Sequence, residues 1–202
     1  MKLYFAPGAC SVAPLIALSE AGIPHEPELV DFMRGKVLKD GRKLSDVNDR
    51  DYVPAMVLDD GQLLTEVGAI LLYVGDLRPD TGLVPPPGTF ERVRLHQWVL
   101  FIATELHKGL GPLFAKEASE EHKAATINKF KSRLGSLAKG LGDKPFLLGD
   151  QFTVADAYAF YALRAWKRFF KQELPGALVP YYDRIAARPK VKAALEAEGY
   201  GT

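Results

Sequence analysis

Cys10 carries the most reactive side chain in this sequence, and it is the single cysteine of the chain. It lies in PGACSVAP, residues 7–14, a stretch typical of a turn from a strand into a helix. The N–H groups and dipole at a helix N-terminus can lower the pKa of a thiol from about 8.5 to about 3.5–7.5, which yields a nucleophilic thiolate. A buried cysteine used only for its volume is the other interpretation, and the sequence supports both about equally. The chain has no CxxC motif, so a disulfide cycle at Cys10 would need an external thiol.

Three further positions could bind a ligand or move a proton. Val53–Pro54 begins an apolar run, where residue chemistry alone favours a trans bond, because only about 5–6% of X–Pro bonds are cis. Glu66 follows a predicted strand, where its carboxylate could cap the next helix or face a ligand amine. His107 shares a helical face with Thr104. In the structural interpretation, the His107 ring is partly packed and one of its nitrogens forms a hydrogen bond. In the functional interpretation, the ring transfers a proton.

The hydrophobic pattern predicts the elements that position these residues. Up to residue 77, strand-like runs and helical spacings give the order β-α-β, an unpatterned stretch, then β-β-α. After residue 89 the strand signals vanish and amphipathic helices follow. The predicted strands are 2–6, 27–32 and a hairpin within 54–66, and the predicted helices are 10–22, 68–77, 90–110, one from Ser119, 153–171, 178–187 and 189–197.

Several residues mark the ends of these elements. Gly22 is suited to end the first helix. Asp60–Gly61 is a strong signal for the turn of the hairpin. Thr153 and Asp156 have the spacing of a capping box, which predicts that a helix begins there.

The stretch RPDTGLVPPPGT, residues 78–89, divides the chain, because consecutive prolines cannot continue a helix or a central strand. We therefore expect an α/β domain over 1–77, a Pro/Gly linker over 78–89 and an all-α domain over 90–202.

Composition excludes several classes of function. The 26 basic and 25 acidic residues give a net charge of +1, so nucleic acid is not an expected partner. The chain has neither a signal-peptide pattern nor an apolar run near the roughly eighteen residues that cross a membrane. With one cysteine it cannot form an intrachain disulfide. We expect a soluble cytoplasmic protein without a membrane partner. The four histidines lack the spacing of metal ligands, so we predict no metal.

Five segments, in this order along the chain, resemble the cytosolic glutathione S-transferases, most closely the bacterial beta class. They are KLYFAPGACSVAP, VPAMVLDDGQLLTE, AILLYVGD, TELHKGLGPLF and FLLGDQFTVADAY. The resemblance covers the whole chain. It implies a thioredoxin-like N-terminal domain that binds glutathione, an all-helical domain that holds a hydrophobic co-substrate, and a symmetric homodimer.

The resemblance also implies roles for residues of the first domain. Cys10 would be a thiol-active residue beside the glutathione sulfur. Pro54 would be a cis proline, and Val53 would pair through its backbone with the cysteinyl part of glutathione. Glu66 and the backbone N–H of Val67 would hold the γ-glutamyl end.

Five further residues complete the predicted site. His107 would lie close to the glutathione sulfur, with Thr104 and Glu105 on the same helical segment. Lys36 is the match to a lysine that contacts glutathione, although the segment 33–44 carries an insertion. Ser11 could act as a further donor that activates the sulfur of bound glutathione.

The sequence departs from the family pattern at three places. Val67 stands where many transferases have serine, which removes one hydroxyl bond to the ligand carboxylate, worth roughly 1.5–3 kcal/mol. Residues 48–51 read Asn-Asp-Arg-Asp where Asn-Pro-x-Gly is usual. Leu100 stands where close relatives have an asparagine near the thiol.

Three functions are compatible with these residues. The first is a glutathione transferase acting on small hydrophobic electrophiles. The second is a glutathione-dependent thiol–disulfide oxidoreductase, or a reductive dehalogenase, that works through a mixed disulfide on Cys10. The third is a non-catalytic binding or regulatory protein on the transferase fold.

Overall fold

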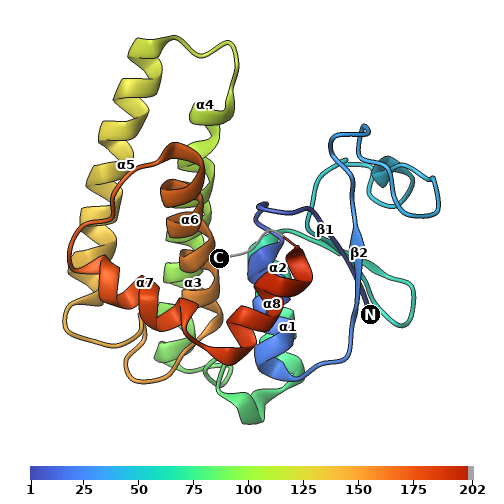
Figure 1. Ribbon diagram of the computed structural model, residues 1–202. Helices are drawn as coiled ribbons and strands as arrows, with labels where there is room; N and C mark the ends of the chain where they lie inside the picture. The colour runs from blue at the N-terminus through green and yellow to red at the C-terminus, as the bar shows by residue number, and fades with distance from the viewer. Residues whose placement is uncertain (200–202) are drawn as a thin grey trace. The chain divides into compact units, whose positions relative to one another are not determined.

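The computed structural model describes residues 1–199, and their contacts divide the chain into two units. The first unit combines Met1–Thr81 with the described residues from Ala186, and the second is Gly82–Ile185 (Figure 1). The segment after residue 186, which the sequence analysis assigns to the helical domain, therefore packs with the first unit.

A four-stranded sheet forms the first unit. Its strands lie in the order β2-β1-β3-β4, with β1 parallel to β2 and antiparallel to β3, and β3 antiparallel to β4. The strands are β1 (Lys2–Phe5), β2 (Glu26–Leu29), β3 (Ala55–Val57) and β4 (Leu63–Thr65). This topology confirms the predicted β-α-β and β-β-α order and the thioredoxin-like architecture, although β2 is shorter than predicted.

Three α-helices and two 3₁₀ turns, η1 (Leu44–Asp46) and η2 (Pro79–Thr81), complete the described part of the first unit. The α-helices are α1 (Val12–Ala21), α2 (Val67–Leu77) and α8 (Pro189–Glu198), and α1 packs against both α2 and α8 (Figure 1). Gly22 ends α1 with a left-handed φ of 63°, as predicted.

Polar contacts attach α8 and the residue before it to the start of the chain. The guanidinium of Arg188 binds both carboxylate oxygens of Glu20, with N–O distances of 2.6 and 2.8 Å. The backbone N–H of Gly8 donates to Oε1 of the buried Glu198 at 2.9 Å. The last helix of the described chain therefore supports the turn that carries Cys10.

The unpatterned stretch between β2 and β3 covers one face of the sheet. Successive residues of a strand point to opposite faces, so Tyr4 and Ala6 lie on one side and Leu3 and Phe5 on the other. The core on the first side consists of Tyr4, Ala6, Val30, Leu38, Leu44, Val53 and Ala55. Because Val53 is part of this core, the segment that leads into Pro54 is held in place against the sheet.

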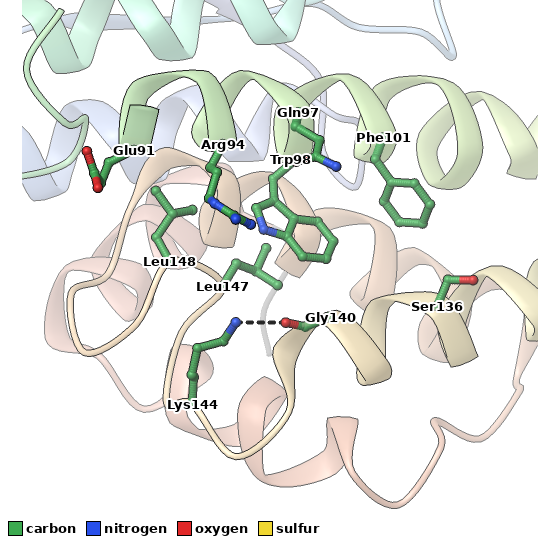
Figure 2. Close-up of a pocket in the computed structure, with 10 residues that line it drawn as sticks. All are labelled: Glu91, Arg94, Gln97, Trp98, Phe101, Ser136, Gly140, Lys144, Leu147 and Leu148. Atoms are coloured by element: carbon green, nitrogen blue, oxygen red, sulfur yellow. Dashed lines mark hydrogen bonds between the residues drawn. The ribbon is translucent and has the colours of Figure 1, made fainter. Parts of the chain in front are cut away.

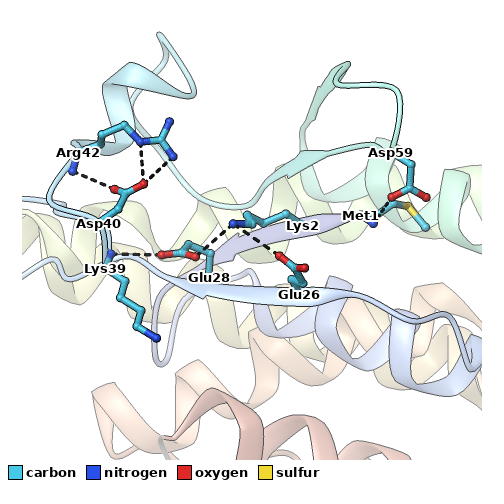
Figure 3. A network of polar contacts seen from close by, with 8 residues as sticks. All are labelled: Met1, Lys2, Glu26, Glu28, Lys39, Asp40, Arg42 and Asp59. Atoms are coloured by element: carbon cyan, nitrogen blue, oxygen red, sulfur yellow. Dashed lines mark hydrogen bonds and ion pairs between the residues drawn. The ribbon is translucent and has the colours of Figure 1, made fainter.

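Charged side chains gather on the strands β1 and β2 and the loops beside them (Figure 3). The Lys2 ammonium lies 3.6 Å from Glu26 and 3.5 Å from Glu28. The Glu26 carboxylate is 78% exposed, and a pair at such an exposed position is screened by water and contributes little to stability. We interpret this network as a solvated surface and assign it no function.

Helices build the second unit. They are α3 (Phe90–Phe101), α4 (Gly111–Phe114), α5 (Glu120–Leu141), α6 (Val154–Phe170) and α7 (Leu178–Ala186). The first thirteen residues of α6, 154–166, are buried, and Trp166 stacks on Phe130 of α5 with ring centroids 4.6 Å apart. Ser119 caps α5 by accepting a hydrogen bond from the N–H of His122 at 3.2 Å, as the sequence predicts.

The predicted capping box at the start of α6 is confirmed. The fully buried Asp156 accepts hydrogen bonds from the N–H groups of Thr153 and Leu147, both at 2.9 Å, and from the Tyr181 hydroxyl at 2.8 Å. Burial raises the pKa of Asp156 and raises that of Tyr181 well above its usual value. One carboxylate thus joins α6, α7 and the loop between α5 and α6.

The predicted α-helix over 90–110 is wrong in its second half. After α3 the chain continues as a π-helical segment, η3 (Ile102–His107), and a short 3₁₀ turn, η4 (Lys108–Leu110). The Thr104 hydroxyl donates to the carbonyl of Leu100 at 3.0 Å, a side-chain bond that competes with regular helix hydrogen bonding. π-Helical turns are rare in proteins, and those that occur are often at functional sites. The location of Thr104, Glu105 and His107 in η3 therefore supports a functional site in this segment.

The helices of residues 1–199 include none with both the length and the apolar character that a bilayer crossing requires.

Candidate active site

The thiol of Cys10 lies against the backbone before Pro54. Cys10 precedes α1 and is 8% exposed, and its Sγ donates a hydrogen bond to the carbonyl oxygen of Val53 at 3.5 Å. The cysteine is buried, as its structural interpretation predicts, yet it also contacts the residue to which the family resemblance assigns glutathione. The Val53–Pro54 peptide bond is cis, so the trans bond favoured by residue chemistry is wrong and the geometry implied by the resemblance is confirmed.

Ser11 holds the Cys10 turn closed. Its hydroxyl accepts from the N–H of Ala6 at 3.1 Å and donates to the carbonyl of the same residue at 3.3 Å. The side chain is fully buried. These contacts support a structural role for Ser11 in the turn, and they give no support to its predicted role as a donor to a ligand.

Glu66 forms a second cluster, between β4 and α2. Its carboxylate accepts hydrogen bonds from the Tyr52 hydroxyl and from Nη1 of Arg50, the latter at 3.4 Å. Its φ of 69° is positive, which costs a non-glycine residue on the order of 1–3 kcal/mol and is frequent at ligand sites. The hydrogen bond with Tyr52 is the main cause that raises the pKa of Arg50, so its guanidinium stays charged.

Val67 begins α2 directly after Glu66. Its side chain is buried, and it is the first residue of the helix. The first N–H groups of a helix have no partner within the helix, so the Val67 N–H is suited to bind an anion, and its role toward glutathione stays a prediction.

Lys36 lies over the segment that precedes Pro54. Its Nζ donates to both the carbonyl oxygen and the carboxylate of Asp51, each at 2.6 Å. Lys36 and Asp51 both have positive φ values, 62° and 52°. The predicted ligand contact of Lys36 therefore competes with a close ion pair inside the first unit.

His107, Thr104 and Glu105 belong to the second unit. Nδ1 of His107 lies 2.8 Å from the Tyr158 hydroxyl, and its ring meets the ring of Tyr161 edge to face. The structure thus confirms the partly packed ring of the structural interpretation. Glu105 pairs with Arg133, with Oε2 and Nε 2.6 Å apart.

The structure brings the predicted site residues together in three groups. Cys10, Val53 and Pro54 form the first group, Glu66 and Val67 lie in the second, and η3 holds the third, which consists of Thr104, Glu105 and His107. Lys36 joins Asp51 beside the first two groups, within the same unit.

Sequence reasoning missed the partners of these residues. Arg50 and Tyr52 hold Glu66, and Tyr158 holds His107. The only sequence signal for Arg50 is its place in the departing stretch 48–51, and Tyr158 lies on a buried helix where an aromatic residue predicts core.

The second unit contains a cavity of about 550 Å³ between α3, α5 and the loop after α5 (Figure 2). Its lining consists of Glu91, Arg94, Gln97, Trp98, Phe101, Ser136, Gly140, Lys144, Leu147 and Leu148. Gly140 lies so close to Trp98 that an added Cβ would overlap the indole ring. His107, which the resemblance places near the glutathione sulfur, is not among these lining residues.

Metal-binding residues do not gather in the described part of the chain. Residues 1–199 contain no group of three or more His, Cys, Asp or Glu side chains that could hold an ion.

Comparison with protein families identifies both halves of the chain. Residues 8–77 match the model "Glutathione S-transferase, N-terminal domain", and residues 104–198 match "Glutathione S-transferase, C-terminal domain". Glutathione S-transferase GstA of Escherichia coli O157:H7 is 41% identical over 201 residues, which covers 98% of this chain and 99% of that protein.

Solved structures agree over the whole chain. The structure titled a ternary complex of BphK, a bacterial GST, has a TM-score of 0.94 at 44% identity and covers 98% of this chain and 100% of that one. A sphingomonad glutathione S-transferase complexed with glutathione has a TM-score of 0.91 at 41% identity, covering 98% and 99%. The beta class enzyme of Sphingomonas chungbukensis has a TM-score of 0.90 at 43% identity, covering 99% and 100%. The chain belongs to the glutathione S-transferase family, and its structural neighbours include bacterial enzymes of the beta class.

Proposed function

We propose that this chain transfers the glutathione thiolate to small hydrophobic electrophiles, with glutathione as its co-substrate. Family membership supports the transferase activity, and the glutathione complex of a 41% identical structure supports the co-substrate. The observation that carries the assignment to this site is the contact of Cys10 Sγ with the carbonyl of Val53. It joins the thiol to the backbone along which the tripeptide would lie.

Glutathione binds as an extended strand in this proposal. Its cysteinyl part pairs with the backbone of Val53, in the manner of an added β-strand. Its γ-glutamyl amine pairs with the Glu66 carboxylate, and its α-carboxylate accepts from the N–H of Val67. Cys10 lies beside the ligand sulfur. Lys36 is a candidate for the glycyl end, where it would have to exchange its bond with Asp51.

The chemistry is a nucleophilic substitution at carbon. The glutathione thiol loses its proton, and the thiolate attacks the electrophilic carbon of the co-substrate. A C–S bond forms as the bond to the leaving group breaks, and a halide leaves with the electron pair. His107 is the proposed acceptor of the thiol proton, and Thr104 and Glu105 are proposed ligand contacts, on the strength of the family resemblance. The apolar cleft for the co-substrate belongs to the helical domain in the same proposal.

The test is glutathione-dependent turnover of an aryl halide such as chlorodinitrobenzene. We expect saturable conjugation that requires glutathione, and weaker glutathione binding by Glu66→Gln, measured by calorimetry. Glu26→Gln is the matched control, because Glu26 belongs to the solvated surface network of the same unit. A wild-type chain that neither binds glutathione nor turns over the halide would contradict the proposal and favour a non-catalytic protein.

The redox and regulatory alternatives are not favoured, because GstA at 41% identity and the BphK structure at 44% identity, each over 98% of this chain, carry the name of glutathione S-transferases. Cys10→Ala separates conjugation from thiol exchange. We expect the variant to lose any glutathione adduct that mass spectrometry detects after exposure to oxidised glutathione, yet to keep conjugation within about tenfold, since one hydrogen-bond donor is worth about 1 kcal/mol. Loss of conjugation by about a thousandfold would show that Cys10 itself carries the reaction.

We further propose a symmetric homodimer in the cytoplasm. One face of α3 exposes the apolar side chains of Phe90, Val93 and Leu100 at helical spacing, which supports an interface between copies. Light scattering of the purified protein would give a dimer mass, and a monomer mass at micromolar concentration would overturn this part of the proposal.

A further inference from the structure

The guanidinium of Arg50 is held beside Glu66 by weak contacts. Its Nη1 lies 3.3 Å from the Tyr52 hydroxyl and 3.4 Å from both Oγ1 of Thr65 and Oε1 of Glu66. These distances are at the upper limit of hydrogen bonding. The contacts of this guanidinium with residues 1–199 all run through Nη1, and the side chain is 57% exposed. Nε and Nη2 are therefore available to a ligand.

Arg50 and Glu66 present opposite charges side by side. The Glu66 carboxylate is 57% exposed, as the guanidinium is, so both charges face water at the start of α2. An α-amino acid head group carries an ammonium and a carboxylate on one carbon, and it matches such a pair in both charge and spacing. The γ-glutamyl end of glutathione is a head group of this kind.

The other cation of this region is less available. Lys36 Nζ makes two bonds of 2.6 Å to Asp51, shorter than any contact of Arg50. Val67 offers the ligand a backbone N–H, while its side chain is apolar, buried and without a hydroxyl. Arginine is well suited to a carboxylate, since its planar guanidinium can donate two parallel N–H bonds.

We propose that Arg50 binds the α-carboxylate of the γ-glutamyl residue of glutathione and takes the place of the hydroxyl that is missing at Val67. This inference rests on the proposed glutathione site. Glu66 then binds the α-ammonium, and the Arg50–Glu66 pair recognises the zwitterion as a unit.

The test is a cycle of protein and ligand variants, measured by calorimetry. We expect Arg50→Gln to weaken glutathione binding about tenfold or more, since a hydrogen bond to a charged group is lost. The same substitution should leave unchanged the affinity for an analogue that lacks the γ-glutamyl α-carboxylate. It should still weaken binding of an analogue that lacks the α-amino group. Arg42→Gln, which removes an exposed arginine paired with Asp40 in the same unit, is the matched control.

Two outcomes would overturn the inference. In the first outcome, Arg50→Gln weakens binding of glutathione and of the analogue without the α-carboxylate, but not of the analogue without the α-amino group. Arg50 would then act through Glu66 as a positioning residue. If Arg50→Gln bound glutathione like the wild type, Arg50 would have no part in binding. A wild-type chain that fails to bind glutathione would instead overturn the proposed function and this inference with it.

A second variant guards against a folding defect. Val67→Ser restores the hydroxyl, so we expect it to recover glutathione affinity in the Arg50→Gln background and to give no gain with the decarboxylated analogue. Failure of this recovery, with the far-ultraviolet circular dichroism of both variants unchanged, would contradict the inference.

Discussion

His107 combines, at the scale of one residue, a packed ring and a polar contact. Its Nδ1 lies at 2.8 Å from the buried Tyr158 hydroxyl, and Tyr161 packs on its ring at 5.0 Å. Both contacts fix the orientation of the imidazole, and fixed orientation is what a proton acceptor requires. They are also what a purely structural histidine would show. Steady-state kinetics and thermal stability of a His107 variant distinguish the catalytic role from the structural one.

We predict that His107→Ala lowers kcat by about a hundredfold or more, because general-base catalysis contributes that much, and leaves the KM for glutathione nearly unchanged. The measurement is steady-state conjugation of an aryl halide. His122→Ala, at an exposed first-turn position of α5, is the control. An unchanged kcat together with a lower melting temperature would establish the structural role instead.

Cys10 illustrates how far residue chemistry can be predicted. Its place at the start of a helix follows from the sequence, because the glycine and proline around it mark a turn. Its contact with Val53 joins residues 43 positions apart, and no local signal encodes such a contact. The cis bond of Pro54 shows the same limit. Residue chemistry favours the trans form, and only the family resemblance implied the cis form.

At the scale of elements, α5 approaches α3 closely where Gly140 faces the Trp98 ring. The Cβ of any other residue at position 140 would overlap the Trp98 ring on the wall of the cavity in Figure 2. Gly135, on the same helix, has open space around it. The two glycines therefore form a natural pair for a comparison.

We predict that Gly140→Ala destabilises the protein by about 1–3 kcal/mol, since overpacking forces the indole to move. Gly135→Ala should stabilise it by about 0.5–1 kcal/mol, the usual gain when alanine replaces glycine inside a helix. Urea unfolding followed by circular dichroism measures both. Equal effects of the two substitutions would refute the close packing of Trp98.

The predictability of the elements depends on the range of their signals. Capping residues and turn residues act locally, so the ends of α1 and α6 follow from Gly22 and from the Thr153–Asp156 box. The segment η3 does not follow, because a π-helical turn preserves the apolar pattern of an α-helix while it changes the hydrogen bonds. The stretch between β2 and β3 shows no hydrophobic period in the sequence. It contributes single buried side chains, such as Leu38 and Leu44, to the core on one face of the sheet.

At the scale of the whole molecule, the first unit draws on both ends of the chain. The sequence divides at residues 78–89, but α8 belongs by its contacts with the unit that holds Cys10. A pattern of apolar residues shows that a helix has a buried face and does not show which partner covers it. The bond from Gly8 to Glu198 spans 190 positions and lies beyond any local signal.

We predict that a chain ending after Ala187 keeps a folded second unit and loses glutathione binding. The truncation removes Arg188 and Glu198 from their partners in the first unit. Both tryptophans of the sequence, Trp98 and Trp166, belong to the second unit, so their fluorescence reports on that unit alone. Urea unfolding by fluorescence should resemble that of the full chain, while calorimetry should detect no binding. Wild-type affinity in the truncated chain would contradict the supporting role of α8.

The bond between Gly8 and Glu198 also bears on how the protein is made. Glu198 lies 190 residues after Gly8, so the carboxylate that anchors the Cys10 turn leaves the ribosome long after the turn itself. Domains generally fold as units during synthesis, so the second unit can fold before α8, which the first unit requires, has been synthesised. The strands of the first unit are then synthesised before the second unit but completed after it, and a nascent chain that stalls before α8 would leave the thiol turn without its Glu198 anchor.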